Sequence, residues 1–419
     1  MSLNLKIKDV ERITVHVPFT PRNQFWCARE QYMWDICEIT RLTTDVPGLV
    51  GYGETISPYT WGKVMDASVE RVKGKNPALF LGDDSLGAGL QMAIYDLVGK
   101  ALEVPAYKLF NLPRVREWCP ISWWNVDMSP EDFAAEAQEA VARGYTSQKM
   151  KGRPWWDIYA QVEAIRAVTP PSYHLDIDWN QMLVNVGNAA PVLTRLDQYD
   201  IIGLYESPIF QRDVNGLRQL QAKITHPIAL HFGVPPFTTA VAENVCAGFV
   251  IGGGVTSVLD QAAQAATFDK PFFLQMVGTG ITTAMSLQFG AVLPMAQWPA
   301  VNCLNLYSDD LLVNPIEIRG GYAHLPEGPG LGIEVDEAAL ERFKMEPPYT
   351  YPRIRQLILV QWPDGRKRYY SKVEQVWTDA GNGNMPVHEP GAKLTPIPND
   401  GTEEWRSLFA RAEDGPVFA

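Results

Sequence analysis

Cysteines are few in this sequence, and they form no recognisable pattern. The 419 residues include 5 cysteines, an odd number, scattered between Cys27 and Cys303 with no Cys-x-x-Cys pair. Structural zinc sites and redox-active dithiols need closely spaced cysteines, so the sequence argues against both. Unpaired, scattered thiols are typical of the reducing cytoplasm, and we expect a cytoplasmic protein.

Long apolar runs and a basic leader are absent as well. No segment approaches the roughly 20 consecutive apolar residues that a membrane helix needs. The first six residues lack the basic stretch followed by an apolar core that marks a secretory signal. We therefore expect neither a membrane span nor secretion.

Positive charge is also in short supply. Lysine and arginine total 36 against 48 aspartates and glutamates, which gives a net charge of −12. Nucleic acids and anionic membranes attract concentrated positive charge, so we expect neither as a partner. A small anionic substrate stays possible, because a metal ion and a few lysines can dominate the local field.

The chain does contain the pattern of a mixed first domain, which we place at residues 1–117. Three candidate strands, at 7–17, 36–43 and 50–54, precede a helix at 86–101 that ends before Pro105. A polar and aromatic loop at residues 20–26 separates the first two strands.

From residue 118 the pattern changes to strands alternating with helices. The candidate strands are 119–123, 145–150, 173–178, 201–206, 228–232, 249–251, 272–275 and 301–304. Amphipathic stretches lie between them, and this alternation predicts an α/β fold with a βα barrel over residues 118–330. We expect residues 331–419 to return to the first domain and to add an extension. Its predicted hairpin has strands at 355–362 and 368–377 joined at Asp364-Gly365, and residues 379–401 are expected to be irregular.

Several of these strands end in polar residues that can bind metals or transfer protons. They are Lys149-Met-Lys151, Asp178-Trp179-Asn180, Glu206-Ser207-Pro208, His231 and Gln275. A parallel barrel gathers the carboxyl ends of its strands on one face, so these residues are expected to converge there. This convergence predicts an active site.

The residue types suggest acid–base chemistry beside a divalent cation. Lys149 and Lys151 are two apart and leave one face of a strand, where either can act as a general base, although lysine pairs are also common on solvated faces. The carboxylates of Asp178 and Glu206 suit Mg²⁺. His231 is a candidate third ligand that would favour a transition metal, with a water or a plain hydrogen-bonded histidine as the alternatives. Asp176 shares a face with Asp178 and is an alternative ligand.

These residues, in this order and spacing, resemble the mandelate racemase and muconate lactonizing branch of the enolase superfamily. The resemblance covers roughly residues 5–345 and also includes residues 93–100 with Pro105, and Ile251-Gly-Gly253. It implies an α+β capping domain on a modified TIM barrel, (β/α)₇β. It also implies Mg²⁺-assisted removal of a proton α to the carboxylate of a small-molecule substrate, and we expect a homo-oligomer. The lysine or histidine base with Mg²⁺ is the general description of this superfamily.

The sequence departs from the family pattern on one side of the site. The histidine–aspartate dyad of the racemases falls on Gln275 and Ala247, the second lysine of the lactonizing enzymes falls on Val250, and an acid near the last strand is replaced by Asn305. We therefore expect Lys149 and Lys151 as catalytic residues, and dehydration of an acid sugar or related hydroxy acid as the reaction. The alternatives are a degenerate member that binds a ligand without turnover, or a racemase or cycloisomerase.

Substrate contacts are expected from residues around this site. They are Asn180, Gln275, Arg22, Trp26 and Asn305. Specificity is expected from the loops at residues 22–29 and 57–61.

Overall fold

The structure, a computed structural model, describes residues 5–56, 62–349 and 353–419, so the predicted specificity loop at 57–61 lies outside the described residues. The chain begins with an antiparallel sheet in the order β1-β2-β3. Its strands are β1 Ile7–His16, β2 Ile36–Thr44 and β3 Val50–Thr55, followed by α2 Asp66–Val72 and α3 Ala88–Ala101. Helix α3 packs closely on β3 because Gly53 has no side chain. A Cβ at this position would lie 2.0 Å from the carbonyl oxygen of Gly89.

The central part of the described chain is a closed parallel barrel. Its strands are β4 Trp118–Asn125, β5 Ser147–Lys151, β6 His174–Asp178, β7 Ile202–Glu206, β8 Ile228–His231, β9 Gly248–Ile251, β10 Phe272–Leu274 and β11 Ala300–Val301. The helices between them are α4 Pro130–Ala142, α5 Ile158–Arg166, α6 Val186–Leu196, α7 Val214–Gln221, α8 Phe237–Ala242, α9 Val255–Thr267 and α10 Gly280–Val292.

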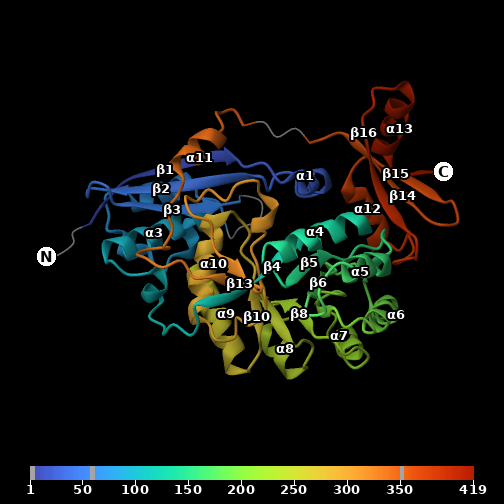
Figure 1. Ribbon diagram of the computed structural model, residues 1–419, viewed down its shortest axis with the longest axis horizontal. Helices are drawn as coiled ribbons and strands as arrows, with labels where there is room; N and C mark the ends of the chain where they lie inside the picture. The colour runs from blue at the N-terminus through green and yellow to red at the C-terminus, as the bar shows by residue number, and fades with distance from the viewer. Residues whose placement is uncertain (1–4, 57–61, 350–352) are drawn as a thin grey trace.

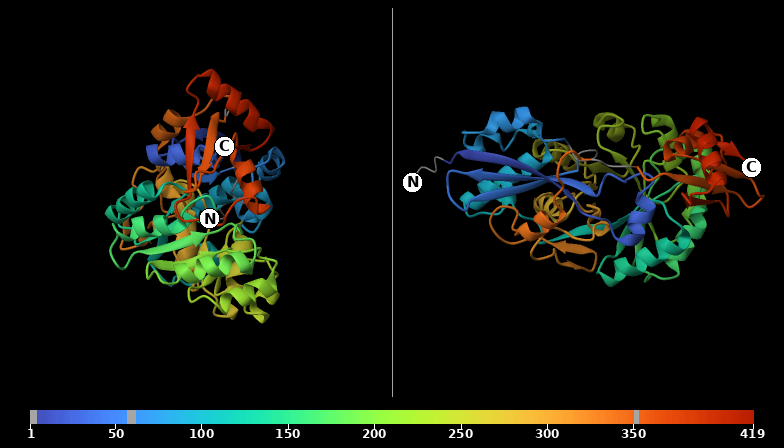
Figure 2. Two further views of the ribbon diagram at one scale, coloured as in Figure 1. Left: turned by 90° about the vertical axis from the view of Figure 1, so that its right-hand side faces the viewer. Right: turned by 90° about the horizontal axis from the view of Figure 1, so that it is seen from above.

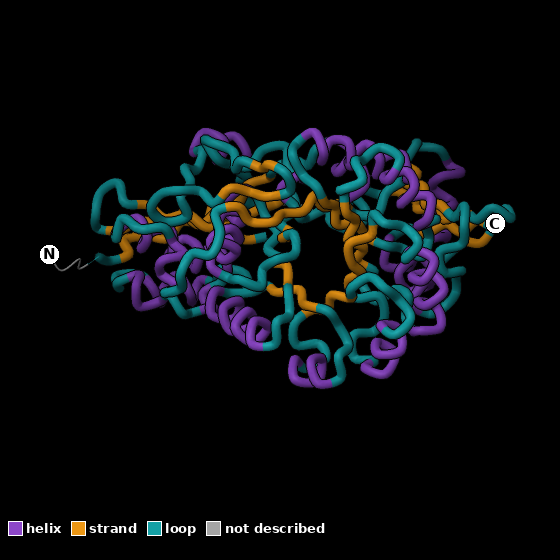
Figure 3. The backbone as a smooth tube through the Cα atoms, turned by 60° about the horizontal axis from the view of Figure 1, so that its bottom comes forward, coloured by secondary structure: helices purple, strands orange, loops and turns teal. Residues whose placement is uncertain are grey.

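The barrel closes through its last strand. Neighbouring strands from β4 to β10 pair in parallel, β11 pairs in parallel with β4, and a bridge between Gln275 and Val301 joins the end of β10 to β11. The strands form a ring in Figure 3. Seven βα units followed by an eighth strand are the (β/α)₇β arrangement that the sequence predicted, so the fold prediction is confirmed.

After the barrel the chain returns to the first sheet. The hairpin β12 Ile318–Arg319 and β13 Tyr322–His324 pairs with the outer edge of β4. Helix α11 Glu337–Phe343 follows, and a bridge between Val15 and Lys344 ties this segment to β1.

The last described part of the chain, residues 353–419, is the C-terminal extension. It has a four-stranded antiparallel sheet in the order β16-β14-β15-β17, with two helices. The elements are β14 Gln356–Gln361, β15 Lys367–Tyr370, α12 Val373–Gly381, β16 Lys393–Pro398, α13 Glu403–Asp414 and β17 Val417–Phe418. The extension, red in Figure 1, lies beside α4 and α5, at the opposite end of the molecule from the first sheet (Figure 2).

Three local predictions were wrong. Residues 21–26 of the predicted loop belong to helix α1, Pro21–Cys27, with Thr20 as its N-cap; Pro21 occupies the first helical position, where a missing N–H costs nothing. The second hairpin strand ends at Tyr370, and the remainder forms α12, whose Val373, Val376 and Ala380 are buried at helical spacing. The stretch expected to be irregular contains β16, an edge strand that tolerates proline. Among the described residues, no helix has the length and apolar composition needed to cross a membrane.

Candidate functional site

The polar residues at the ends of β5 to β8 form one connected group. Parallel pairing sets Lys151 opposite Asp178, and Asp178 opposite Glu206. Lys151 Nζ donates to Asp178 and, at 3.0 Å, to Asn180 Oδ1. Lys149 forms an ion pair with Glu206. The structure therefore brings Lys149, Lys151, Asp178, Asn180 and Glu206 together with His231, and we call these six residues the lysine–carboxylate cluster.

The two lysines of this cluster differ in accessibility. Lys149 is 1% exposed, and its Nζ lies 4.0 Å from the centre of the Phe273 ring on β10, across the barrel. Lys151 is 9% exposed, with its Nζ 5.8 Å from the centre of the Trp124 ring. Because Lys149 is enclosed and Lys151 lies nearer the barrel mouth, only Lys151 is placed to meet a substrate from solvent.

Glu206 and His231 form a coupled pair at the other side of the cluster. His231 Nε2 lies 3.0 Å from Glu206 Oε1, and the histidine side chain is 41% exposed while Glu206 is buried. Burial raises the pKa of Glu206, but the charge of Lys149 and the His231 hydrogen bond outweigh it, so the pKa lies below its usual value. Burial lowers the pKa of His231, but the hydrogen bond and charge of Glu206 outweigh that effect and raise it. In this arrangement a protonated His231 forms an ion pair with Glu206.

Asp176 lies two residues before Asp178 on β6, on the same face of the strand and deeper in the barrel. It is opposite Lys149 in the strand register and 4% exposed. Burial raises the pKa of Asp176 to about 6, with Lys149 lowering it and Glu206 raising it. Its depth makes Asp176 a weaker candidate ligand than Asp178.

The donor chemistry of the cluster fits a hard divalent cation. Asp178 and Glu206 are carboxylates on adjacent strand ends, 1% and 0% exposed, and oxygen ligands are those that Mg²⁺ prefers. Within residues 5–56, 62–349 and 353–419, however, no three His, Cys, Asp or Glu side chains are gathered into a ready-made metal site. The two carboxylates instead hold the two lysines, and His231 is a softer ligand than the carboxylate it replaces.

Three of the four other predicted contact residues, Asn305, Arg22 and Trp26, are engaged elsewhere. Asn305 accepts from the backbone N of Trp124 and donates to its carbonyl oxygen, at 3.0 and 2.8 Å. Arg22 Nη1 and Trp26 Nε1 donate to Glu136 and Asp132 of α4, at 2.6 and 2.8 Å. Gln275 bridges β10 to β11 through its backbone, and its side chain makes no hydrogen bond within the described chain. The structure therefore does not connect these four residues to the lysine–carboxylate cluster.

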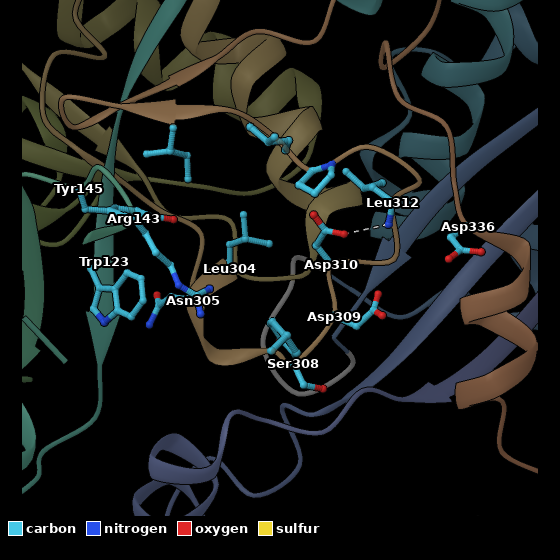
Figure 4. A pocket seen from close by; sticks show the side chains of 14 residues that line it. Trp123, Arg143, Tyr145, Leu304, Asn305, Ser308, Asp309, Asp310, Leu312 and Asp336 are labelled. Atoms are coloured by element: carbon cyan, nitrogen blue, oxygen red, sulfur yellow. Dashed lines mark hydrogen bonds between the residues drawn. The ribbon is translucent and has the colours of Figure 1, made fainter. Parts of the chain in front are cut away.

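Asn305 does line a cavity, but a different one. A cavity of about 470 Å³ lies between β4, the residues that follow α4 and the segment 304–318 that follows β11 (Figure 4). Its lining includes Trp123, Arg143, Asn305, Asp309 and Asp310, and none of the six cluster residues. This cavity is therefore separate from the barrel mouth.

Sequence reasoning missed two residues beside the cluster. Asp127, in the loop after β4, accepts from the indole N–H groups of Trp155 and Trp156 at 2.9 and 2.8 Å and pairs with Arg29. His388 of the extension packs its ring against Trp179, with the ring centres 5.0 Å apart. The tryptophans lie shortly after strand ends, which is a signal that the sequence contains, but nothing local in the sequence indicated His388.

Comparisons with known proteins give a consistent result. A family model described as Enolase C-terminal domain-like matches residues 132–339. The N-succinyl-L-Arg/Lys racemase of Bacillus cereus is 23% identical over 374 residues, which cover 80% of this chain and 97% of the racemase. The D-xylonate dehydratase of Haloferax volcanii is 26% identical over 395 residues, covering 81% and 90%. An enolase structure from Thermobispora bispora, complexed with magnesium and formate, has a TM-score of 0.66 at 20% identity and covers 81% of this chain and 92% of its own.

Proposed function

Because the chain belongs to the enolase superfamily, whose matched relatives are racemases, cycloisomerases and dehydratases, we propose that it is a lyase that dehydrates an acid sugar or a related hydroxy acid. The observation that supports dehydration most is that a general base is present on only one side of the site. Lys151 is the accessible amine of the cluster, whereas Val250 on β9 and Gln275 directly after β10 have side chains that cannot act as a general acid or base. Racemisation needs a proton donor on both faces of a planar enolate, and elimination needs a base on only one.

In the proposed reaction Lys151, as a free amine, takes the proton from the carbon next to the substrate carboxylate. The resulting lysine ammonium then gives that proton to the hydroxyl on the neighbouring carbon, which leaves as water while the double bond forms. Asp178 and Asn180 orient the Lys151 side chain during both transfers. Lys149 is enclosed by Glu206 and Phe273, which favours a role in fixing Glu206 over contact with the substrate.

A divalent cation, Mg²⁺ in this proposal, would be held by Asp178 and Glu206, with His231 or a water completing the protein side. When bound, it would stabilise the negative charge that develops on the substrate carboxylate. The support is the donor chemistry of the two carboxylates and the magnesium in the related Thermobispora bispora structure.

Turnover of acid sugars tests the proposal directly. Incubation with a panel of sugar acids that includes D-xylonate, with and without Mg²⁺ and in deuterated water, should give a dehydrated product from at least one of them. Lys151→Ala should lower that rate by at least about 100-fold, since general-base catalysis typically contributes about 10²–10⁴-fold. The surface lysine variant Lys223→Ala should retain it. Deuterium exchange with inversion at the α-carbon would instead show a base on the Gln275 side and a racemase.

Metal binding is a second and separate test. Calorimetric titration with Mg²⁺ should show a heat of binding that Asp178→Ala abolishes and that Asp200→Ala, a change at an exposed aspartate, leaves intact. His231→Ala lowers the affinity if the imidazole is a ligand and leaves it unchanged if a water completes the site. Unchanged affinity in Asp178→Ala would refute the ligand assignment.

A ligand-binding member without turnover is the second candidate. It is favoured by the pairing of both lysines with carboxylates and by the missing ready-made metal cluster among the described residues. Metal binding without turnover of any sugar acid in the panel would support this candidate over the dehydratase.

A further inference from the structure

The C-terminal extension contacts the loop that follows Lys151. That loop runs from Gly152 to Asp157 and leads into α5. Its Asp157 donates its backbone N–H to the carbonyl oxygen of Ala392 at 2.9 Å and accepts from the backbone N of Gly391 at 2.8 Å. The fully buried guanidinium of Arg153 lies 4.8 Å from the centre of the Trp377 ring on α12. The loop after the proposed base is therefore held from the extension side at both ends.

His388 is the central contact between this loop and the extension. Its backbone N donates to the carbonyl oxygen of Pro154 at 3.2 Å, and its Nδ1 lies 3.3 Å from that of Trp156. A carbonyl oxygen only accepts, so Nδ1 carries the proton and donates. The side chain is 2% exposed.

The same imidazole touches the strand end that carries Asp178. The His388 ring meets the Trp179 ring edge-on, at an interplanar angle of 90°. Trp179 in turn lies against Gly152, where an added Cβ would be 2.7 Å from the indole Cε3. The backbone N of Gly152 donates to the carbonyl oxygen of Asp178 at 2.9 Å. Close packing of this kind transmits displacement, so a shift of His388 displaces the residues that directly follow Lys151 and Asp178.

The extension lies outside the part of the chain that the family model matches. The Bacillus cereus racemase is matched over 97% of its length by only 80% of this chain, and the family model ends at residue 339. His388 thus belongs to a part of the chain that the family model does not match.

We propose that His388 is a positioning residue that holds the ends of β5 and β6, and with them Lys151 and Asp178, in their relative placement. The imidazole acts through two separate contacts, the hydrogen bond to Trp156 and the ring contact with Trp179. The expected effect on catalysis rests on the proposed function. The positioning itself can be measured without a substrate.

Hydrogen exchange of the full-length protein, followed by mass spectrometry with and without Mg²⁺, tests the positioning. His388→Leu should lower the protection of peptides covering 151–157 and 178–184 roughly tenfold, since both contacts are buried. The matched control is His324→Leu, which removes a histidine ring that contacts Trp118 at the start of β4, the opposite end of the strands from Lys151, with ring centres 4.7 Å apart. It should leave both peptides unchanged.

Two conservative variants separate the contacts. Asparagine tolerates the left-handed backbone of residue 388, φ 50°, and its amide can replace the Nδ1 donor, so His388→Asn should restore protection of 151–157 only. His388→Phe keeps the ring and should restore 178–184 only. If His388→Leu fails to fold, these two variants decide the question. Unchanged protection in all three, or an equal loss in His324→Leu, would overturn the proposal.

A kinetic readout links positioning to the reaction. Where the wild type turns over a sugar acid, His388→Leu should lower kcat at least tenfold with little change in KM, and His388→Asn should recover part of the loss. An unchanged kcat in His388→Leu would count against the proposal. If the wild type has no turnover, the proposed function fails, and the exchange result still decides whether His388 positions the two strand ends.

Discussion

The buried His388 makes the stability of the fold depend on pH. Burial, opposed by the hydrogen bond to Trp156 and assisted by the nearby charge of Arg153, lowers the pKa of His388 from its ordinary value of 6.5 to about 3. In the unfolded chain this histidine is therefore protonated below about pH 6.5, whereas in the folded chain it is protonated only below about pH 3. The stability associated with neutral His388 is fully present above pH 6.5 and is lost as the pH falls towards 3.

This dependence can be measured against a variant without the titrating group. The free energy of unfolding of the wild type should fall relative to that of His388→Phe between pH 6.5 and pH 4, by up to a few kcal/mol at about 1.4 kcal/mol per pH unit. Denaturant unfolding across this range provides the measurement. Parallel curves for the two proteins would show that His388 has the same pKa in the folded and the unfolded chain, which would contradict the lowered value.

At the residue scale, the sequence predicted which side chains gather but not how they pair. Strand-end positions and a period of two indicate that Lys149, Lys151, Asp178, Glu206 and His231 share one face, and the structure brings them together. The contacts between particular side chains depend on the stagger of neighbouring strands and on depth in the barrel, which a period cannot supply. Asn305 is an example: it was expected to contact the substrate, but the oxygen and the nitrogen of its amide both bind the Trp124 backbone.

At the scale of elements, the junction of β5 and β6 depends on one glycine. A Cβ on Gly152 would lie 2.7 Å from Trp179 Cε3 and 2.9 Å from Ile177 Cγ2, both parts of enclosed side chains. Gly152→Ala should therefore cost about 1–3 kcal/mol of stability, the usual range for overpacking. Thermal unfolding should show the loss. Gly381→Ala, at the open end of α12 with nothing within 4 Å, is the control and should not lower stability. Equal stability of both variants would show that the indole can move aside.

Elements were predicted well where the pattern was regular. The alternation of strands and helices from residue 118 gave the order of the barrel, because most of the strands contain short apolar runs and most of the helices between them are amphipathic; α10, which is buried on all sides, is an exception. The extension was predicted less well. Its edge strand β16 contains Pro396 and Pro398, which are typical of loops, and only the pairing of β16 with β14 makes it a strand.

At the scale of the whole molecule, the extension and the barrel share one core. Alternate residues of β14 point to opposite sides: Ile358 and Val360 join the main core of the barrel, while Leu357 packs with Trp405 and Phe409 in a separate outer cluster. Independent domains unfold in separate transitions, whereas parts that share a core unfold together. We therefore expect the extension to unfold with the barrel.

Weakening only the outer cluster tests this coupling. Trp405 is buried and stacks on Phe409 with ring centres 4.8 Å apart, so Trp405→Ala should cost about 3–5 kcal/mol. If the core is shared, calorimetry should show one transition moved to lower temperature, and cleavage by a protease during heating should begin in the barrel and the extension together. Leu79→Ala, at a side chain 74% exposed in the first domain, should leave the midpoint unchanged. A new early transition, with cleavage confined to residues 353–419, would mean that the extension unfolds alone, and its hold on the loop after Lys151 would then be lost before the barrel melts.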